Sequence, residues 1–103
     1  MAETFVYVTL IESITEEQLL AASEGLPEWR KEYIRGKNLS GRIEGTFAYL
    51  LLMKLVSERF GLTDTARFTY GKYGKPYFSG INVFFSISHC KTAVAAAASL
   101  TEI

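Results

Sequence analysis

The sequence predicts a single α+β domain, residues 1–103, in which three helices pack against a mainly antiparallel sheet. Two properties of the whole chain predict a packed domain: 103 residues suffice for one hydrophobic core, and 49% of them are apolar. A third observation gives the class. Strand-like and helix-like segments follow one another in the order β-α-α-α-β-β-β, so the later strands are grouped after the helices.

The first predicted element is a strand over residues 4–11. Aromatic and β-branched side chains dominate this segment, and such side chains favour strands. Both alternating sets are apolar, with Phe5 and Tyr7 in one and Val6 and Val8 in the other. Because both faces are apolar, we expect this strand to be central in the sheet.

Two short helices are predicted next. Overlapping capping boxes begin at Ser13 and Thr15, and they predict a helix over residues 16–23 that stops at the following glycine. A proline in the first turn and a glycine after the last turn predict a second helix over residues 27–35.

The longest predicted helix covers residues 41–60, with Ser40 as its N-cap and Gly61 as its stop. Its apolar positions extend nearly round the helix and are Ile43, Phe47, Tyr49, Leu50, Leu51, Leu52, Met53, Leu55 and Val56. A helix with so little polar surface is expected to be covered on most sides.

Three strands are predicted after this helix, over residues 67–70, 83–88 and 93–98. The third of these segments is ambiguous, because its alanines favour a helix. The segment is short and follows a strand and a turn, so we predict a strand there.

Composition excludes several functions. Eleven basic and eleven acidic side chains cancel, so no general field favours nucleic acid or an acidic membrane. The single cysteine, Cys90, cannot form an internal disulfide, and one cysteine with one histidine rules out the usual structural zinc site. No signal peptide is evident, and the longest apolar run of a predicted helix, residues 47–53, is far short of the roughly 20 residues that cross a bilayer. We therefore expect a cytoplasmic protein with no nucleic-acid or membrane partner.

The candidate site lies in residues 73–89. Lys75 stands on a Gly-Lys-Pro turn, and Ser88 and His89 end an apolar strand-like run after one reversal of the chain. A cation, a hydroxyl and an imidazole are the groups with which a protein holds a phosphate. Each also has a structural alternative: a solvated loop lysine, a turn cap and a histidine bonded to backbone.

Three pieces of the sequence resemble the N-terminal half of the two-domain 4'-phosphopantetheinyl transferases. They are Pro-Glu-Trp-Arg-Lys at residues 27–31, Arg42 ahead of the apolar helix, and Tyr-Gly-Lys-Pro at residues 73–76 followed by Phe-Ser-Ile-Ser-His at residues 85–89. The resemblance covers residues 27–99. It implies the fold of that N-terminal lobe and a part in the transfer of phosphopantetheine from coenzyme A to a carrier-protein serine, the holo-acyl-carrier-protein synthase reaction.

The resemblance also implies which residues bind coenzyme A. Family positions that hold its phosphates match the Gly-Lys-Pro turn and the Ser-His pair, and further cations near the 3'-phosphate match the second helix and the start of the third. In that order, the residues are Lys75, Ser88 and His89, then Arg30 or Lys31, and Arg42. Lysine as a point charge and arginine as a planar fork both suit phosphate oxygens. For Lys31, a solvated helix face is the favoured alternative.

The chain departs from the family where magnesium is bound. The family has Asn at the position of Ser86, and its Asp-x-Glu follows the strand that here ends near Ser99; this sequence contains no Asp-x-Glu, and its one aspartate, Asp64, falls in a predicted loop. Magnesium prefers carboxylates besides phosphate and water. We therefore expect no catalytic residue, no metal site and no transferase activity in this chain alone, with Mg²⁺ entering only if a partner supplies carboxylates.

Three functions stay open at this point. The first is a transferase-like half that is completed by a partner, either as a homodimer or with a separate C-terminal-half polypeptide, and that meets an acyl or peptidyl carrier protein. A lone half would leave an apolar face uncovered, which favours such a partner. The second is a non-catalytic homodimeric binding or scaffolding module derived from the family. The third is a truncated reading frame whose function belongs to a missing C-terminal half.

Overall fold

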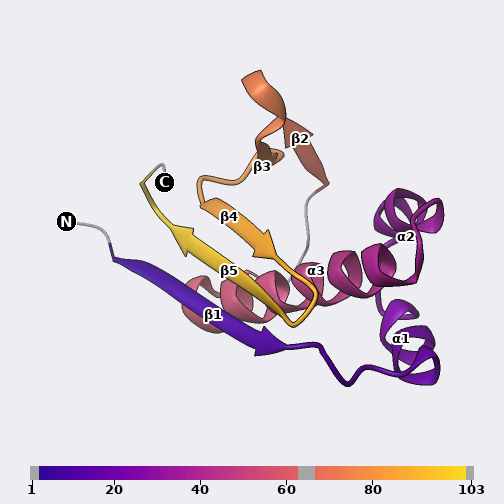
Figure 1. Cartoon of the computed structure of the whole chain (residues 1–103). Helices are drawn as coiled ribbons and strands as arrows, with labels where there is room; N and C mark the ends of the chain where they lie inside the picture. The colour runs from indigo at the N-terminus through magenta and orange to yellow at the C-terminus, as the bar shows by residue number, and fades with distance from the viewer. Residues whose placement is uncertain (1–2, 63–66, 102–103) are drawn as a thin grey trace.

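The computed structural model describes residues 3–62 and 67–101 and has the predicted α+β class. Three helices accompany strands that all pair in the antiparallel sense (Figure 1). In chain order, the elements are β1 (Thr4–Leu10), α1 (Glu16–Ser23), α2 (Glu28–Arg35), α3 (Leu39–Phe60), β2 (Phe68–Tyr70), the 3₁₀ turn η1 (Lys72–Gly74), β3 (Pro76–Phe78), β4 (Phe84–His89) and β5 (Ala93–Ser99).

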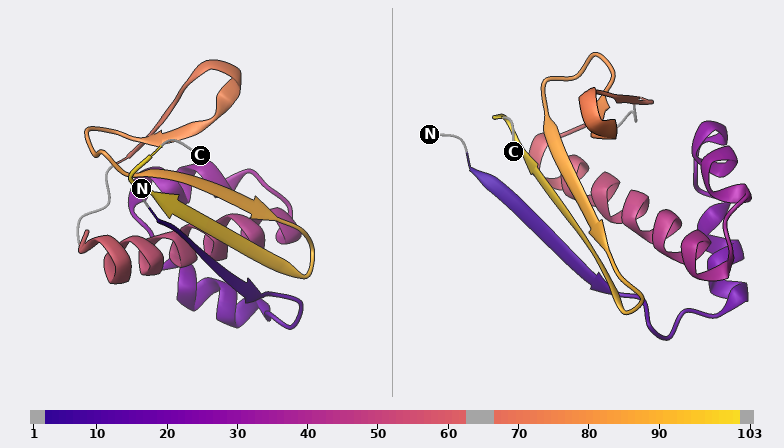
Figure 2. Two further views of the ribbon diagram at one scale, coloured as in Figure 1. Left: turned by 90° about the vertical axis from the view of Figure 1, so that its left-hand side faces the viewer. Right: turned by 45° about the horizontal axis from the view of Figure 1, so that its top comes forward.

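The main sheet has the strand order β1-β5-β4, and α3 lies along one of its faces (Figures 1 and 2). The prediction that the first strand is central is therefore wrong, because β1 is an edge strand. Its inner neighbour is β5, paired from Thr4 with Ser99 to Leu10 with Ala93. Three apolar side chains of β1 that face away from α3, those of Val6, Val8 and Leu10, remain exposed.

The alanine-rich segment is a strand, as predicted. β5 pairs with β1 on one side and with β4 on the other, so backbone hydrogen bonds on both sides outweigh the helix preference of alanine. Its small side chains leave room for bulkier neighbours: Ala98 lies between Phe5 and Phe85 on the face toward α3.

The core lies between this face and α3. Leu52 and Leu55 of the helix are fully buried, as are Phe85 and Ala98 of the sheet. The predicted coverage of α3 is confirmed in part: its buried residues lie between Gly45 and Val56, and Leu50, Leu51 and Met53 are partly buried. Burial of a side chain such as Leu52 stabilises the fold by about 1.5–3 kcal/mol.

Local capping sets the helix ends. At α1 the Thr15 hydroxyl accepts a hydrogen bond from the Gln18 backbone N–H, and the Gln18 side chain accepts one from the Thr15 N–H, so the second of the two overlapping capping boxes is the one used. α3 begins earlier than predicted, because the Asn38 side chain, and not Ser40, caps it. Gly61 ends α3 in the left-handed conformation at φ 67°, as its place predicted.

The structure contains one strand that the sequence did not predict. β3 pairs with β2 in a separate hairpin, with Tyr70 opposite Pro76. Tyr73 and Gly74, both at positive φ, turn the chain between the two strands. The side chain of Phe68 anchors the hairpin, because its ring centroid lies 5.0 Å from that of Trp29 and 4.7 Å from that of Phe85.

Within residues 3–62 and 67–101, no helix is both long and apolar enough to cross a membrane.

Candidate functional site

A hollow of about 260 Å³ lies where α2, the first half of α3, the hairpin and the end of β4 meet. We call it the arginine hollow. The residues that line it are Arg30, Tyr33, Lys37, Gly41, Glu44, Gly45, Ala48, Phe68, Tyr70, Gly74, Pro76, Ile87 and His89. Two of these, Arg30 and His89, are among the residues that the sequence resemblance implies.

Arg30 is the unusual residue of this hollow, because its side chain is charged and only 5% exposed. Its Nη2 donates a hydrogen bond to the Gly45 carbonyl over 3.0 Å, but its Nε has no hydrogen-bond partner. Among the described residues, no carboxylate lies within the 4 Å of an ion pair with it. Desolvation lowers the pKa of Arg30 from its ordinary value, and arginine stays protonated in proteins nonetheless. The hollow therefore contains a buried positive charge with an unused donor.

Aromatic rings hold the Arg30 guanidinium in place. Its Cζ atom lies 4.4 Å from the ring centroid of Tyr33 and 5.5 Å from those of Tyr49 and Phe68. Contact with several ring faces partly offsets the loss of water around the cation.

Close packing of α2 on α3 sets the position of Arg30. A Cβ atom on Gly45 of α3 would come within 2.8 Å of Ile34 Cγ2 on α2, so only glycine permits this approach. The same glycine offers the carbonyl that binds Arg30. Gly45 thus fixes both the spacing of the helices and one end of the guanidinium.

His89 enters the hollow from the end of β4. Its Nδ1 lies 3.5 Å from Glu44 Oε1 of α3. The Glu44 side chain is 16% exposed and also lines the hollow. Sequence reasoning missed Glu44, although it is the one acidic residue in the first four turns of an otherwise apolar helix.

The predicted trio of Lys75, Ser88 and His89 does not converge on one point. Ser88 and His89 are consecutive in a strand, so their side chains point to opposite faces of the sheet, and Ser88 is exposed on the face away from α3. Gly74 and Pro76 line the arginine hollow, whereas Lys75 between them does not. The Lys75 ammonium instead lies 5.9 Å from the ring centroid of Tyr77.

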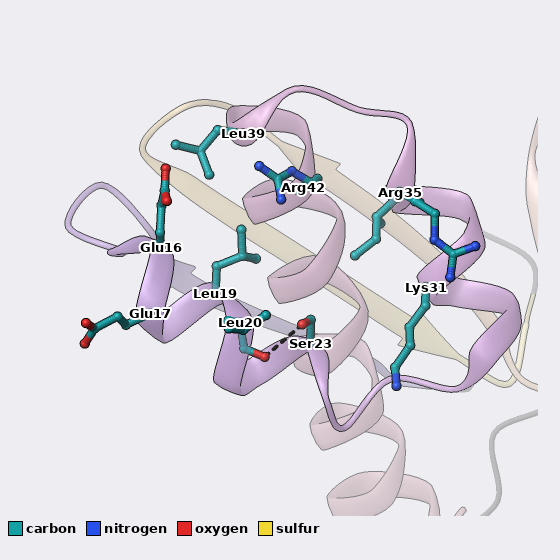
Figure 3. Close-up of a pocket in the computed structure, with 10 residues that line it drawn as sticks. Glu16, Glu17, Leu19, Leu20, Ser23, Lys31, Arg35, Leu39 and Arg42 are labelled. Atoms are coloured by element: carbon teal, nitrogen blue, oxygen red, sulfur yellow. Dashed lines mark hydrogen bonds between the residues drawn. The ribbon is translucent and has the colours of Figure 1, made fainter.

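Lys31 and Arg42 line a second hollow, of about 510 Å³, between α1, α2 and the start of α3 (Figure 3). The neighbours Arg30 and Lys31 on α2 therefore serve different hollows. In Figure 3 the Arg42 guanidinium and the Lys31 ammonium extend in different directions. Arg35 is a third cation that lines this hollow, and its Nη2 lies 3.4 Å from Glu28 Oε1 in an ion pair. Cations that diverge in this way form no common anion site.

The residues that the structure describes contain no group of three or more histidine, cysteine, aspartate or glutamate side chains able to hold a metal ion. Asp64, the one aspartate of the sequence, lies outside the described residues.

Comparison with known protein families finds no family model that matches this chain. Comparison with curated proteins likewise finds no matching relative.

Proposed function

We propose that this chain is the nucleotide-holding lobe of a 4'-phosphopantetheinyl transferase-like protein, and that the arginine hollow takes a phosphate group of coenzyme A. The observation that carries the proposal is Arg30, a buried cation with a free Nε donor and no ion-pair partner among the described residues. A buried charge is costly unless it is paired. A phosphate in the hollow would lie beside this charge and pair with it.

Other residues of the hollow suit the same ligand. Lys37 also lines it, with its ammonium 4.8 Å from the Tyr33 ring centroid, and His89 adds an imidazole that lies beside Glu44. Tyr70 is about half exposed and offers a ring face to the part of a nucleotide next to its phosphate, whereas the Tyr33 ring already contacts Arg30 and Lys37.

Size limits what this hollow can hold. At about 260 Å³ it is smaller than the roughly 300–1,000 Å³ of pockets that bury a drug-sized ligand. The hollow fits a phosphate with the adjoining sugar and not a whole coenzyme A molecule. The pantetheine arm would lie outside it.

The name of the ligand rests on the sequence resemblance, since the arginine hollow by itself selects a phosphate and not a particular nucleotide. In this proposal the lobe is that of the transferase family's N-terminal half, in the cytoplasm, and a carrier protein is the acceptor. The described residues contain no group of three or more histidine, cysteine, aspartate or glutamate side chains able to hold a metal ion, so the proposal assigns magnesium to a partner. The carboxylates for transfer would come from another segment or another polypeptide. A non-catalytic binding module would use the same hollow without them.

Calorimetric titration at low salt tests the proposal. We expect coenzyme A to bind, with Arg30→Gln weakening binding by about 10-fold or more, because a hydrogen bond to a charged group is worth about 1.5–3 kcal/mol. The matched control is Arg59→Gln, which removes the same group from the exposed end of α3, outside both hollows, and should leave affinity nearly unchanged. Dephospho-coenzyme A and pantetheine, titrated in parallel, identify the phosphate that is bound.

Two outcomes would contradict the proposal. One is the absence of binding heat for coenzyme A with the unmodified chain. The other is equal weakening by Arg30→Gln and Arg59→Gln. Because Arg30 is buried, its variant must first show a cooperative thermal transition; if it does not, Lys37→Ala replaces it at the exposed rim of the same hollow and should weaken binding by several-fold.

A further inference from the structure

The face of the main sheet that points away from α3 is uncovered, apolar and without charge. Figure 2 shows the helix on one side of the three strands only. We call the bare side the open face. Strand register puts three residues of β1, four of β5 and three of β4 on it after Thr4 at its edge: Val6, Val8 and Leu10; Ala93, Ala95, Ala97 and the buried Ser99; and Phe84, Ser86 and Ser88.

The exposure of β1 on this face is large. Val6, Val8 and Leu10 are 61%, 64% and 69% exposed. When one face of an antiparallel sheet packs on the core and the other faces water, its strands normally alternate apolar and polar residues, with the polar residues in water. A contiguous apolar patch that breaks this alternation marks an interaction surface.

The open face also has a relief. Its three large aliphatic side chains stand in one row on β1, which we call the ridge. The three alanines stand in the next row on β5, which we call the trough. The register sets them side by side, with Val8 next to Ala95 and Leu10 next to Ala93.

A ridge beside a trough is complementary to a rotated copy of itself. A two-fold axis parallel to the strands, passing between β1 and β5, would place the ridge of each copy over the trough of the other. Such an isologous contact needs only one surface, repeated twice. No charged side chain would have to be desolvated to form it.

We propose that the open face is a two-fold interface between two copies of this chain, with each ridge seated in the partner's trough. β1 and β5 have seven residues each and β4 has six, so strands about 4.8 Å apart with about 3.3 Å per residue cover roughly 320 Å² on each copy and about 640 Å² in the pair. This area is below the roughly 1,200 Å² of stable specific interfaces, so we propose a weak, reversible dimer. The proposal does not depend on what the arginine hollow binds.

Sedimentation equilibrium over roughly 5–500 µM tests the interface. The unmodified chain should pass from 11.5 kDa to twice that mass as concentration rises. Val8→Glu should stay monomeric throughout this range. Leu20→Glu is the matched control, because Leu20 on α1 is 67% exposed and an equally drastic change there should leave the dimer intact.

A third variant distinguishes specific packing of the ridge into the trough from unspecific apolar association. Ala95→Leu fills the trough while adding apolar surface. If the ridge sits in the trough, Ala95→Leu should weaken dimerisation by about 10-fold or more, as Val8→Glu does. If the association is unspecific and apolar, Ala95→Leu should strengthen it. Thermal melts of all variants show whether each is folded, and Ala95→Leu, with no added charge, keeps the test decisive if Val8→Glu unfolds.

A mass of 11.5 kDa at every concentration would overturn the proposal, and would assign the open face to a different polypeptide or to a further segment of the same one. A dimer that survives both Val8→Glu and Ala95→Leu would overturn it too, because the contact would then lie elsewhere, for example along the free edge of β1.

Discussion

Replacing Gly45 with alanine tests how closely α2 and α3 approach. The added Cβ would lie 2.8 Å from Ile34 Cγ2, so one helix must move. Overpacking of this kind costs about 1–3 kcal/mol, and the better helix propensity of alanine returns about 1 kcal/mol. We expect a net loss of about 1 kcal/mol in the free energy of unfolding, which lowers Tm by about 4–8 °C in a domain of this size. Urea unfolding and thermal melts measure both quantities.

The second variant, Ile34→Leu, makes this prediction specific. It removes the Cγ2 branch that the new Cβ would meet and keeps the volume of the side chain. Combined with Gly45→Ala, it should recover most of the lost stability, so the two changes are not additive. If Gly45→Ala alone raises Tm, as alanine does at an open helix position, then the close approach does not constrain the fold and this explanation of the position of Arg30 is wrong.

Two further substitutions test local interactions. Thr15→Ala removes the hydroxyl half of the α1 capping box and should reduce stability by about 1 kcal/mol in urea unfolding, while Thr15→Ser should be nearly neutral; an equal loss in both would contradict the capping role. Tyr7→Phe removes the hydroxyl that donates to Glu58, and this hydrogen bond is the main reason why the pKa of Glu58 lies below its ordinary value. A lowered folded-state pKa contributes stability above the unfolded-state value and loses it as the pH falls through the folded value, so the stability difference between wild type and Tyr7→Phe should shrink from about pH 7 to about pH 3. NMR titration should show the Glu58 pKa rising in the variant, and an unchanged value would rule out this cause.

The helices could be predicted from the sequence because their ends depend on neighbouring residues. The Thr15 capping box and Gly61 act within a few positions of the backbone they cap, and both were found in advance. The sequence does not distinguish Asn38 from Ser40, two residues away, because asparagine and serine are about equally favourable at an N-cap.

The place of β1 in the sheet could not be predicted in the same way. Apolar side chains on both faces describe what lies above and below a strand, but they do not show whether both of its edges pair with other strands, which decides whether it is central. In the structure, β5 takes the centre because it pairs on both sides. The extra strand β3 is three residues long and contains a proline, so its pattern was too short to detect.

The candidate site was predicted in part. Arg30 and His89 do line one hollow, although they are 59 positions apart in the chain, 89 minus 30. Ser88 is excluded by strand alternation, and Lys31 by the turn of α2, which sends neighbouring side chains to different sides of the helix. Glu44 joins His89 only through tertiary packing, which no local pattern encodes.

Phe68 belongs at once to the aromatic anchor of the β2–β3 hairpin and to the lining of the arginine hollow. Order in the hairpin and occupancy of the hollow are therefore linked through a single ring, since a small two-stranded unit is only marginally stable by itself. By thermodynamic reciprocity, any molecule that binds the hollow more tightly when this ring is in place also stabilises the ordered hairpin. A change that destabilises the ordered hairpin lowers the affinity for that molecule through the same coupling.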